Sequence, residues 1–228
     1  MFETVRSCFS LAYSQFRYPV TLSLEHRPCV LVGGGKVAVR KARPLLEAGA
    51  SLTVIAPVLN PGFPTLKEEW PSLLLLERPY RAGDLKGAFL VIAATDNRAI
   101  NEAVANEARG ENSLLNVVDD PEAGTFSVPG SYAAGQVRFS VSTGGNPRFT
   151  HLLLADLAAG YGADIGAFAA YLDIQRDEAK RLFPDSDTRR KFWRAILTDN
   201  LLEELRAGRL DQVKERISNE IDRCRAKS

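Results

Sequence analysis

The sequence contains few of the residues that build metal centres or disulfide frameworks. Its 228 residues include three cysteines, Cys8, Cys29 and Cys224, and two histidines, His26 and His151. The cysteines are scattered and form no Cys-x-x-Cys pair, so the pattern predicts neither a structural zinc site nor a disulfide framework. We expect Cys29 in a buried strand and Cys224 on the apolar stripe of a helix.

Long apolar runs and an excess of either charge are also missing. The longest apolar runs, such as LLLL, are far shorter than the roughly 20 residues that span a bilayer. The N-terminal stretch MFETVRSCFSLAYSQFRY has a short, interrupted apolar centre and no small-residue cleavage site, unlike a signal peptide. Lys and Arg (29) nearly balance Asp and Glu (28), so no overall field attracts nucleic acid or an anionic membrane. We therefore expect a cytoplasmic protein that binds neither nucleic acid nor membrane.

The first half of the chain alternates short apolar runs with helical patterns, which is typical of βαβ units and a parallel sheet. YPVTLSL at 18–24 is expected to add a further strand. Two helices are expected, at Lys36–Ala48 and Arg98–Ala108, closed by Gly49 and Gly110 as left-handed caps. The expected strands of the sheet are Pro28–Val32, Ser51–Ala56, Leu73–Leu76, Phe89–Ala93 and Leu114–Val118.

The pattern changes after residue 119. TFSVPGSY and QVRFSVST alternate apolar and polar residues on either side of AAG, which predicts an antiparallel hairpin. So small a hairpin cannot cover its own faces and edges, and we expect a second copy of the chain to cover them in a homodimer. From about residue 150 the pattern is helical, with Gly160 and Gly162 arguing against one unbroken helix. Further helices are expected at Thr188–Leu197, in LLEELRAG up to Gly208, and along the C-terminal stripe of Leu210, Val213, Ile217 and Ile221.

The glycine-rich stretch GGGKVA stands directly after the first strand and directly before the first helix, and it fits the pattern G-x-G-x-x-A. Gly33 would make the tight turn, Gly35 would let a phosphate approach the backbone, and Ala38 would let the helix pack closely on the strand. The helix N-terminus would then hold a pyrophosphate. The alternative is a tight strand-to-helix turn without a ligand.

One part of a dinucleotide site is missing. The second strand ends in Ala56-Pro57-Val58, without the acidic residue that accepts ribose hydroxyls in many NAD sites and without an arginine for a 2′-phosphate. The residues therefore leave the choice between NAD and NADP open.

These patterns together predict an α/β fold in three parts. A Rossmann-type parallel-sheet domain is expected at 1–119, with 1–17 as an N-terminal extension. A small β-rich dimerisation module is expected at 120–150 and a helical C-terminal domain at 151–228.

Polar residues follow the later strands of the sheet, at the edge where ligands of such folds bind. Thr95 and Asp96 are candidates for cofactor contact or for capping the next helix. Asp119 and Asp120 follow the last strand, where a carboxylate could accept a proton while a hydride leaves for the cofactor. A pair of aspartates before a proline is also ordinary turn chemistry.

Four linked motifs stand out, in this order and spacing: VLVGGGKVAVRKARPLLEAGASLTVIAP, VIAATDNRAIN, NVVDDPEAGTFSVPG and FSVSTGGNP. Together they resemble the precorrin-2 dehydrogenases of siroheme biosynthesis, some of which are also sirohydrochlorin ferrochelatases. The resemblance implies NAD as cofactor, a homodimer, and oxidation of precorrin-2 to sirohydrochlorin. In bifunctional members Fe²⁺ is then inserted to give siroheme. It implies Asp119 as the catalytic residue and cofactor contacts at Gly35, Lys36, Val37, Pro57 and Val58.

The chain departs from the family pattern after the hairpin. Many members read S-[ST]-G-G-x-S-P followed by a basic helix, whereas this chain reads Ser142-Thr143-Gly144-Gly145-Asn146-Pro147. His151, Leu154 and Asp156 stand where basic residues are common in the family. This departure weakens the expectations about substrate contacts and about iron insertion more than the expectation of dehydrogenation.

A tetrapyrrole polycarboxylate calls for cations and hydroxyls in its pocket. The candidates are Lys36, Arg40, Arg138, Arg148, Ser142 and Thr143. The cations could instead be ordinary surface charges, and the two hydroxyls could cap the helix that follows. Two other functions stay open: a general NAD(P)-dependent reductase of a small metabolite, and a non-enzymatic NAD-sensing module.

Overall fold

The computed structural model describes residues 18–226, and the chain divides into two compact units, Met1–Val128 and Pro129–Ser228. The expected N-terminal extension, with Cys8, lies outside the described residues. Each unit is described by itself below.

The first unit is built on a parallel sheet of five strands in the order β3-β2-β1-β4-β5. At its centre, Val32 of β1 pairs with Ile55 of β2 on one side and with Ala93 of β4 on the other. The order reverses direction between β1 and β4, as it does in Rossmann folds. The predicted strands are confirmed, with ends that move by one residue at most. Their bounds are β1 Pro28–Val32, β2 Ser51–Ala56, β3 Leu74–Glu77, β4 Leu90–Ala93 and β5 Leu114–Val117.

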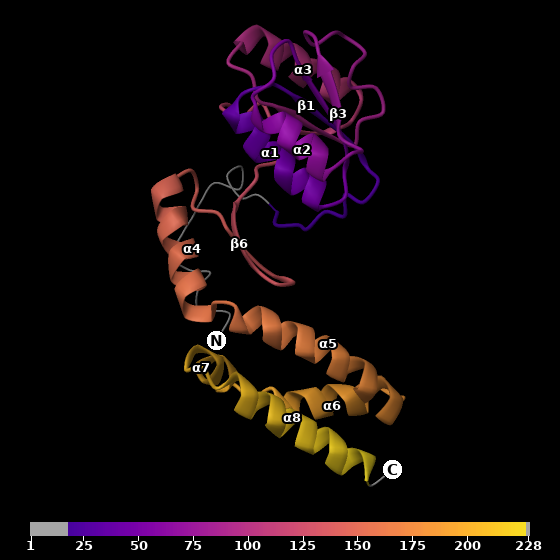
Figure 1. The fold of residues 1–228 in the computed structure, drawn as a ribbon, viewed down its shortest axis with the longest axis vertical. Helices are drawn as coiled ribbons and strands as arrows, with labels where there is room; N and C mark the ends of the chain where they lie inside the picture. Colours follow the sequence, from indigo (N-terminus) through magenta and orange to yellow (C-terminus); the bar gives the residue numbers. More distant parts are fainter. Residues whose placement is uncertain (1–17, 227–228) are drawn as a thin grey trace. The chain divides into compact units, whose positions relative to one another are not determined.

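Helices cover both faces of this sheet, as Figure 1 shows for α1 (Lys36–Glu47), α2 (Gly62–Glu69) and α3 (Arg98–Gly110). The helices α1 and α2 share one apolar core with the sheet and α3 shares the other. Because both faces are covered, the strands can be apolar throughout: all four residues of β4 are buried. Cys29 of β1 is 1% exposed, as expected, and burial raises the pKa of its thiol to about 11.

Two sequence-based expectations in this unit are wrong. YPVTLSL forms no strand: Tyr18 is 84% exposed and only Leu24 at its end is buried. The alternation that favours a strand finds no neighbouring strand to pair with in the described part of the chain. Gly110 is not a left-handed cap, because α3 continues through it and the positive φ of 56° falls on Asn112. By contrast, Gly49 has a φ of +78° and does close α1.

The sequence analysis also missed α2, which begins in the segment PGFPTLKEEW. Prolines suggest a break, but Pro64 stands in the first turn, where a backbone N–H has no partner within the helix. Phe63 and Leu66 then bury against the sheet, both at 1% exposure or less.

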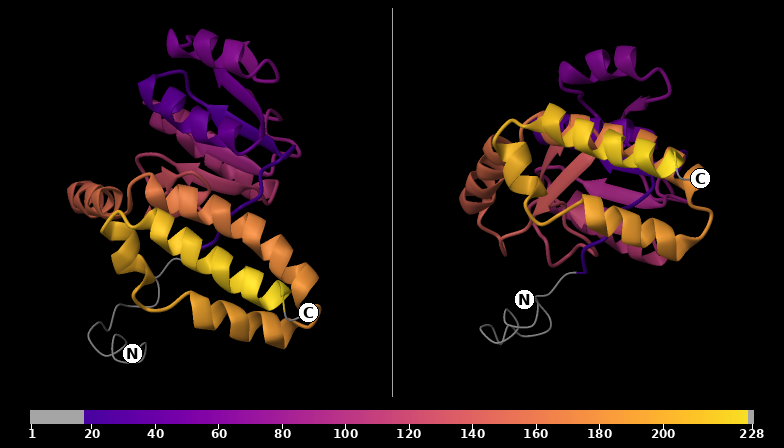
Figure 2. Two further views of the ribbon diagram at one scale, coloured as in Figure 1. Left: turned by 60° about the horizontal axis from the view of Figure 1, so that its bottom comes forward. Right: turned by 90° about the horizontal axis from the view of Figure 1, so that it is seen from below.

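The second unit begins with the predicted antiparallel hairpin, β6 (Gly130–Ala134) and β7 (Val137–Val141), joined through Gly135 at a φ of +56°. The helical region that follows is broken at Gly162, as expected, into α4 (Pro147–Tyr161) and α5 (Asp164–Leu182). Figure 2 shows α5 beside α8 (Leu210–Arg225), with α6 (Ser186–Ile196) and α7 (Leu201–Arg206) completing the group. The predicted stripe of α8 forms its core, with Val213, Ile217 and Ile221 at most 2% exposed.

The helix α4 is apolar yet buries none of its side chains in this unit. Phe149 and Leu152 are 51% and 49% exposed. Among the described residues no single helix is long and apolar enough to cross a membrane, although α4 and α5, which meet at a 61° bend, pass that test of length and composition as a pair.

Candidate functional site

The loop after β1 is tied to both neighbouring strands. The amide of Gly33 donates to the carbonyl of Ile55 at the end of β2, and the carbonyl of Val32 accepts from Ala94 after β4. Gly33 has a φ of +134°, and a Cβ there would lie 2.3 Å from the carbonyl oxygen of Ala94. Only glycine fits this position, so Gly33 makes the tight turn that the sequence predicted.

The next two glycines have opposite surroundings. A Cβ on Gly34 would lie 2.0 Å from the carbonyl oxygen of Val58, so this position is closed by the protein itself. A Cβ on Gly35 would meet no atom within 4 Å, and its φ of −80° and ψ of −177° suit any residue. Nothing within the described chain therefore requires glycine at position 35, whereas a ligand that approaches the backbone would.

The N-terminus of α1 is left open for an anion. Gly35 is its N-cap, no side chain of the described residues caps it, and its first turn holds no acidic residue. Lys36 and Val37 are the first two helical residues, both exposed, and their N–H groups have no partner within the helix. Ala38, behind them, is fully buried, as predicted for close packing on the strand. The residues present thus fit a dinucleotide pyrophosphate: an open backbone, free N–H groups and the positive end of a helix dipole.

The segment after β2 is fixed against the glycine loop. The amide of Asn60 donates to the carbonyl of Gly34 (2.8 Å), and the Asn60 side chain accepts from Gly62. Pro57 is exposed and Val58 is 78% exposed. An adenosine that reached this edge would meet an apolar, uncharged surface. The anchoring role of Asn60 was not predicted.

The segment after β4 is held by side chains of α3. The Asn97 side chain, rather than Thr95 or Asp96, caps α3 by accepting from Ile100. The Thr95 hydroxyl bonds within the loop and to Asn101, and Asp96 is exposed. The alternative role of Thr95 and Asp96, capping of the helix, is therefore excluded, because Asn97 is the N-cap residue.

The two aspartates in the segment after β5 differ in their contacts. The Asp120 side chain accepts from the amide of Ala123 (3.2 Å), and its own amide donates to Val117, so it closes a turn. Asp119 is exposed, and the described residues give its carboxylate no hydrogen bond or ion pair. Asp120 has a structural role, so of the two aspartates after β5 only Asp119 has a carboxylate without a partner among the described residues.

The loop that carries Asp119 is closed at its base. Thr125 exchanges backbone and hydroxyl bonds with Leu115, and the Asn116 amide donates to the carbonyl of Phe126 (3.1 Å). The side-chain nitrogen of Asn116 makes that bond, while its side-chain oxygen, Oδ1, is buried without a partner among the described residues. The loop is thus anchored on β5, with one unsatisfied acceptor at its base that sequence reasoning did not anticipate.

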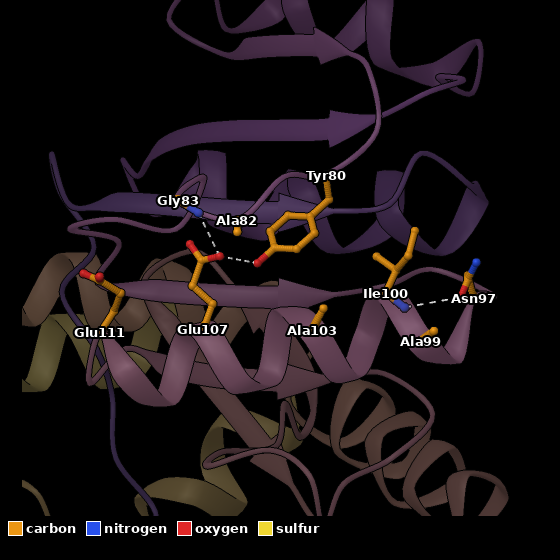
Figure 3. Close-up of a pocket in the computed structure, with 9 residues that line it drawn as sticks. All are labelled: Tyr80, Ala82, Gly83, Asn97, Ala99, Ile100, Ala103, Glu107 and Glu111. Carbon is orange, nitrogen blue, oxygen red and sulfur yellow. Dashed lines mark hydrogen bonds between the residues drawn. The ribbon is translucent and has the colours of Figure 1, made fainter.

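A separate hollow of about 640 Å³ lies between the β3–β4 connection and the outer side of α3 (Figure 3). Its carboxylate, Glu107, accepts from the Tyr80 hydroxyl and from the amides of Gly83 and Leu85. Burial and this carboxylate raise the pKa of Tyr80 well above its usual range. Because Glu107 is fully engaged in holding the connection and no predicted site residue lines the hollow, we do not assign the reaction to it.

Most of the candidates for substrate contact, among them Arg138, Ser142 and Thr143, lie in the second unit. The Thr143 hydroxyl bonds to the carbonyl of Asn146 and to Thr150, while Asn146 caps α4. Arg138 donates to the carbonyl of Gly135 at the hairpin turn (3.0 Å), and Ser142 is exposed. Thr143 thus supports the turn before α4, whereas Ser142 is available to a ligand.

Two family models match the chain. Residues 20–130 match the family described as "Putative NAD(P)-binding", which contains the whole parallel sheet and the loops after its strands. Residues 164–221 match the sirohaem synthase dimerisation region, which contains α5 to most of α8.

Curated relatives agree with both matches. The siroheme synthase of Chromobacterium violaceum is 40% identical over 192 residues, which are 84% of this chain and 41% of that protein. The siroheme synthase of Nitrosomonas eutropha is 37% identical over 210 residues, 90% of this chain and 44% of that protein. The chain is therefore similar to one part of the siroheme synthases, through an NAD(P)-binding match at residues 20–130 and a dimerisation match at residues 164–221. It spans less than half the length of these siroheme synthases.

A solved structure extends the comparison to the fold. That of "SirC, precorrin-2 dehydrogenase" has a TM-score of 0.71 and 24% identity, and the alignment covers 87% of this chain and all of that one. At this identity the likeness shows the fold alone. It confirms the predicted order of a Rossmann-type sheet and a helical C-terminal region.

Proposed function

We propose that the chain oxidises precorrin-2 to sirohydrochlorin with NAD⁺ in siroheme biosynthesis. The observation that carries the proposal is the unpaired carboxylate of Asp119, which follows a strand of the same sheet whose glycine loop is open to a pyrophosphate. The siroheme synthase relatives and the name of the structural neighbour support the choice of substrate.

The reaction removes two electrons and two hydrogens from the macrocycle. Bound NAD⁺ would supply the acceptor for one of these hydrogens, which leaves with its electron pair as a hydride. Asp119 accepts the other as a proton, so the carboxylate must be ionised before the reaction. The glycine loop and the N-terminus of α1 would hold the pyrophosphate of the cofactor and so restrict where the cofactor lies. The cofactor contacts thus stay proposals for Gly33, Gly35, Lys36, Val37, Pro57, Val58, Thr95 and Asp96.

An anaerobic assay tests the proposal directly. Precorrin-2 and NAD⁺ are mixed with the protein, and NADH formation and the tetrapyrrole spectrum are followed together. We expect one NADH for each sirohydrochlorin formed. NAD⁺ binding without oxidation of precorrin-2, together with turnover of a simple alcohol or acid, would favour a general reductase. Binding without any turnover would favour an NAD-sensing module.

Insertion of Fe²⁺ into sirohydrochlorin is a second activity for the same assay. Residues 18–226 contain no group of three or more His, Cys, Asp or Glu side chains that could hold a metal ion. Iron would therefore enter as a substrate, and its insertion needs deprotonated pyrrole nitrogens rather than a resident protein site. Addition of Fe²⁺ after the oxidation is complete would reveal siroheme by its spectrum.

The cofactor is expected to be NAD⁺ rather than NADP⁺. The segment after β2 presents Pro57 and the 78% exposed Val58, with no cation in either position to bind a 2′-phosphate. We expect kcat/KM to be higher with NAD⁺ than with NADP⁺. The variant Val58→Arg should raise kcat/KM for NADP⁺ by about tenfold, because the arginine can make one charge-assisted bond to the 2′-phosphate. Equal kcat/KM for the two cofactors in the wild type would contradict this preference.

The functional protein is proposed to be a homodimer. None of the side chains of the apolar helix α4 is fully buried, and the described residues add no third strand to the two-stranded hairpin. A second copy of the chain could cover both features, in keeping with the dimerisation region matched by α5 to α8.

A charge on α4 should separate the copies. Leu152 is 49% exposed, so Leu152→Asp should leave the fold of one chain intact but place a carboxylate in the interface. We expect sedimentation to show a dimer for the wild type and a shift to monomer for this variant. Leu74→Asp on β3, also 49% exposed, is the matched control and should stay dimeric. A wild type that sediments as a concentration-independent monomer would refute the homodimer.

The predicted cytoplasmic location and the absence of nucleic-acid and membrane partners stay expectations from the sequence.

A further inference from the structure

The side-chain amide of Asn101 makes two hydrogen bonds to Thr95, one through its nitrogen and one through its oxygen. Its Nδ2 donates to the carbonyl oxygen of Thr95 (2.9 Å), and its Oδ1 lies 2.7 Å from the Thr95 hydroxyl, from which it accepts. Asn101 stands in the second turn of α3, so a rigid helix holds the backbone that follows β4. We call this pair of bonds the Asn101 clamp.

The clamp acts next to the glycine loop. Thr95 follows Ala94, whose carbonyl oxygen is the atom that a Cβ on Gly33 would strike at 2.3 Å. The strands β1 and β4 are neighbours in the sheet, and the strand order reverses direction between them. Ligands of open α/β sheets bind in the crevice at this reversal. The clamp therefore fixes one wall of the crevice, and Gly33 belongs to the other.

The clamp also changes the role expected of Thr95. Its hydroxyl has one hydrogen, which it shares between Asn101 and the carbonyl of Asn97, and it accepts from the amide of Asn97 (3.2 Å). A hydroxyl already bonded in these directions has little capacity left for a cofactor. Thr95 would therefore serve the site through its backbone, whose position Asn101 determines.

We propose that Asn101 is a positioning residue for the dinucleotide: it holds the Thr95 backbone where the crevice between β1 and β4 keeps the width that the cofactor needs. The proposal rests on the proposed NAD⁺-dependent function. It concerns cofactor affinity, because Asn101 supplies no group to the reacting atoms.

The variant Asn101→Ala removes both bonds of the clamp. We expect NAD⁺ to bind about tenfold more weakly in a direct titration, which is the loss typical of one or two neutral hydrogen bonds. The KM for NAD⁺ should rise in parallel, while kcat at saturating NAD⁺ stays within about threefold of the wild type. Unchanged NAD⁺ affinity in this variant would overturn the proposal.

Asn97→Ala is the matched control. Asn97 is also an asparagine at the start of α3, and its side chain caps the helix through Ile100 (3.2 Å) without contacting Thr95. Loss of the cap lowers the melting temperature but leaves the clamp in place, since the contacts of Asn97 with Thr95 use only its backbone. If Asn97→Ala weakened NAD⁺ binding as much as Asn101→Ala, the effect would be general helix destabilisation and the positioning role would be wrong.

A double-mutant cycle with Thr95→Val completes the test. Valine keeps the shape of threonine but lacks the hydroxyl that Asn101 binds, so Asn101→Ala should cost less NAD⁺ affinity in the Thr95→Val background than in the wild type. Additive losses would refute the clamp as the cause. If the wild type binds NAD⁺ but does not oxidise precorrin-2, the proposed reaction is refuted, while the double-mutant cycle still tests the role of Asn101. If the wild type does not bind NAD⁺, both proposals are refuted.

Discussion

The variant Asp119→Asn should oxidise precorrin-2 about 10²- to 10⁴-fold more slowly than the wild type, the range typical of removing a general base. The carboxylate is exposed and has no hydrogen bond or ion pair among the described residues, so its replacement removes no contact that the fold uses. Asparagine has nearly the same size but cannot take up a proton near neutral pH. We therefore expect an unchanged melting temperature and unchanged NAD⁺ affinity, with the loss confined to kcat.

Asp120→Asn is the control for this experiment. Asp120 holds its turn by accepting from the amide of Ala123, and the amide oxygen of asparagine can accept the same bond. We expect near wild-type activity from this neighbour. Full activity in both variants, or loss in Asp119→Asn through unfolding alone, would return Asp119 to the role of a turn residue.

The same pair of variants separates the two possible reactions of the family. If Asp119→Asn abolished oxidation but still inserted Fe²⁺ into supplied sirohydrochlorin, the two activities would not share this base. Loss of both would place iron insertion at the same carboxylate, which would then take protons from the pyrrole nitrogens as well.

The parallel sheet could be predicted because its strands are short, mostly apolar runs, and the central strands are buried on both faces. The run LVIA in β4 is short and rich in β-branched residues, which favours a buried strand over a helix, and only its first residue differs from the expected bounds. YPVTLSL has the alternation of a strand but depends on a partner strand, which local pattern does not reveal. The helix α2 was missed for the opposite reason, since its prolines argue locally against a helix that tertiary burial of Phe63 and Leu66 supports.

The site was predictable where a residue type has one dominant reason to be present. The glycine loop is such a case, because few positions need a bare backbone between a strand and a helix. The asparagines around the site are different. Asn60, Asn97, Asn101 and Asn116 each hold a loop through a specific partner, and their partners could be identified only in three dimensions. Sequence alone therefore predicted candidate ligand-binding segments and missed the asparagine side chains that anchor those segments.

Gly35→Val tests the dinucleotide site without disturbing the fold. The backbone at Gly35 is extended, which valine adopts readily, and an added Cβ would meet no atom within 4 Å. The change at the N-cap of α1 costs at most about 1 kcal/mol, because Gly35 caps the helix without a side chain. The branched side chain would occupy the space through which the pyrophosphate reaches the N–H groups of Lys36 and Val37. Loss of one or two bonds to a charged group, each worth about 1.5–3 kcal/mol, predicts roughly 10²-fold weaker NAD⁺ binding.

The neighbouring glycines show why position 35 is the informative one. Gly34→Ala would drive a methyl group into the carbonyl of Val58, and Gly33→Ala would strain a φ of +134° against Ala94, so either should lower the melting temperature whether or not a ligand binds there. Gly35→Val should instead keep the wild-type melting temperature to within a few degrees and fail in a direct NAD⁺ titration. A variant that stays folded and binds NAD⁺ with wild-type affinity would mean that the three glycines serve only the turn between β1 and α1, and that the cofactor, if one binds, lies elsewhere on the carboxyl edge of the sheet.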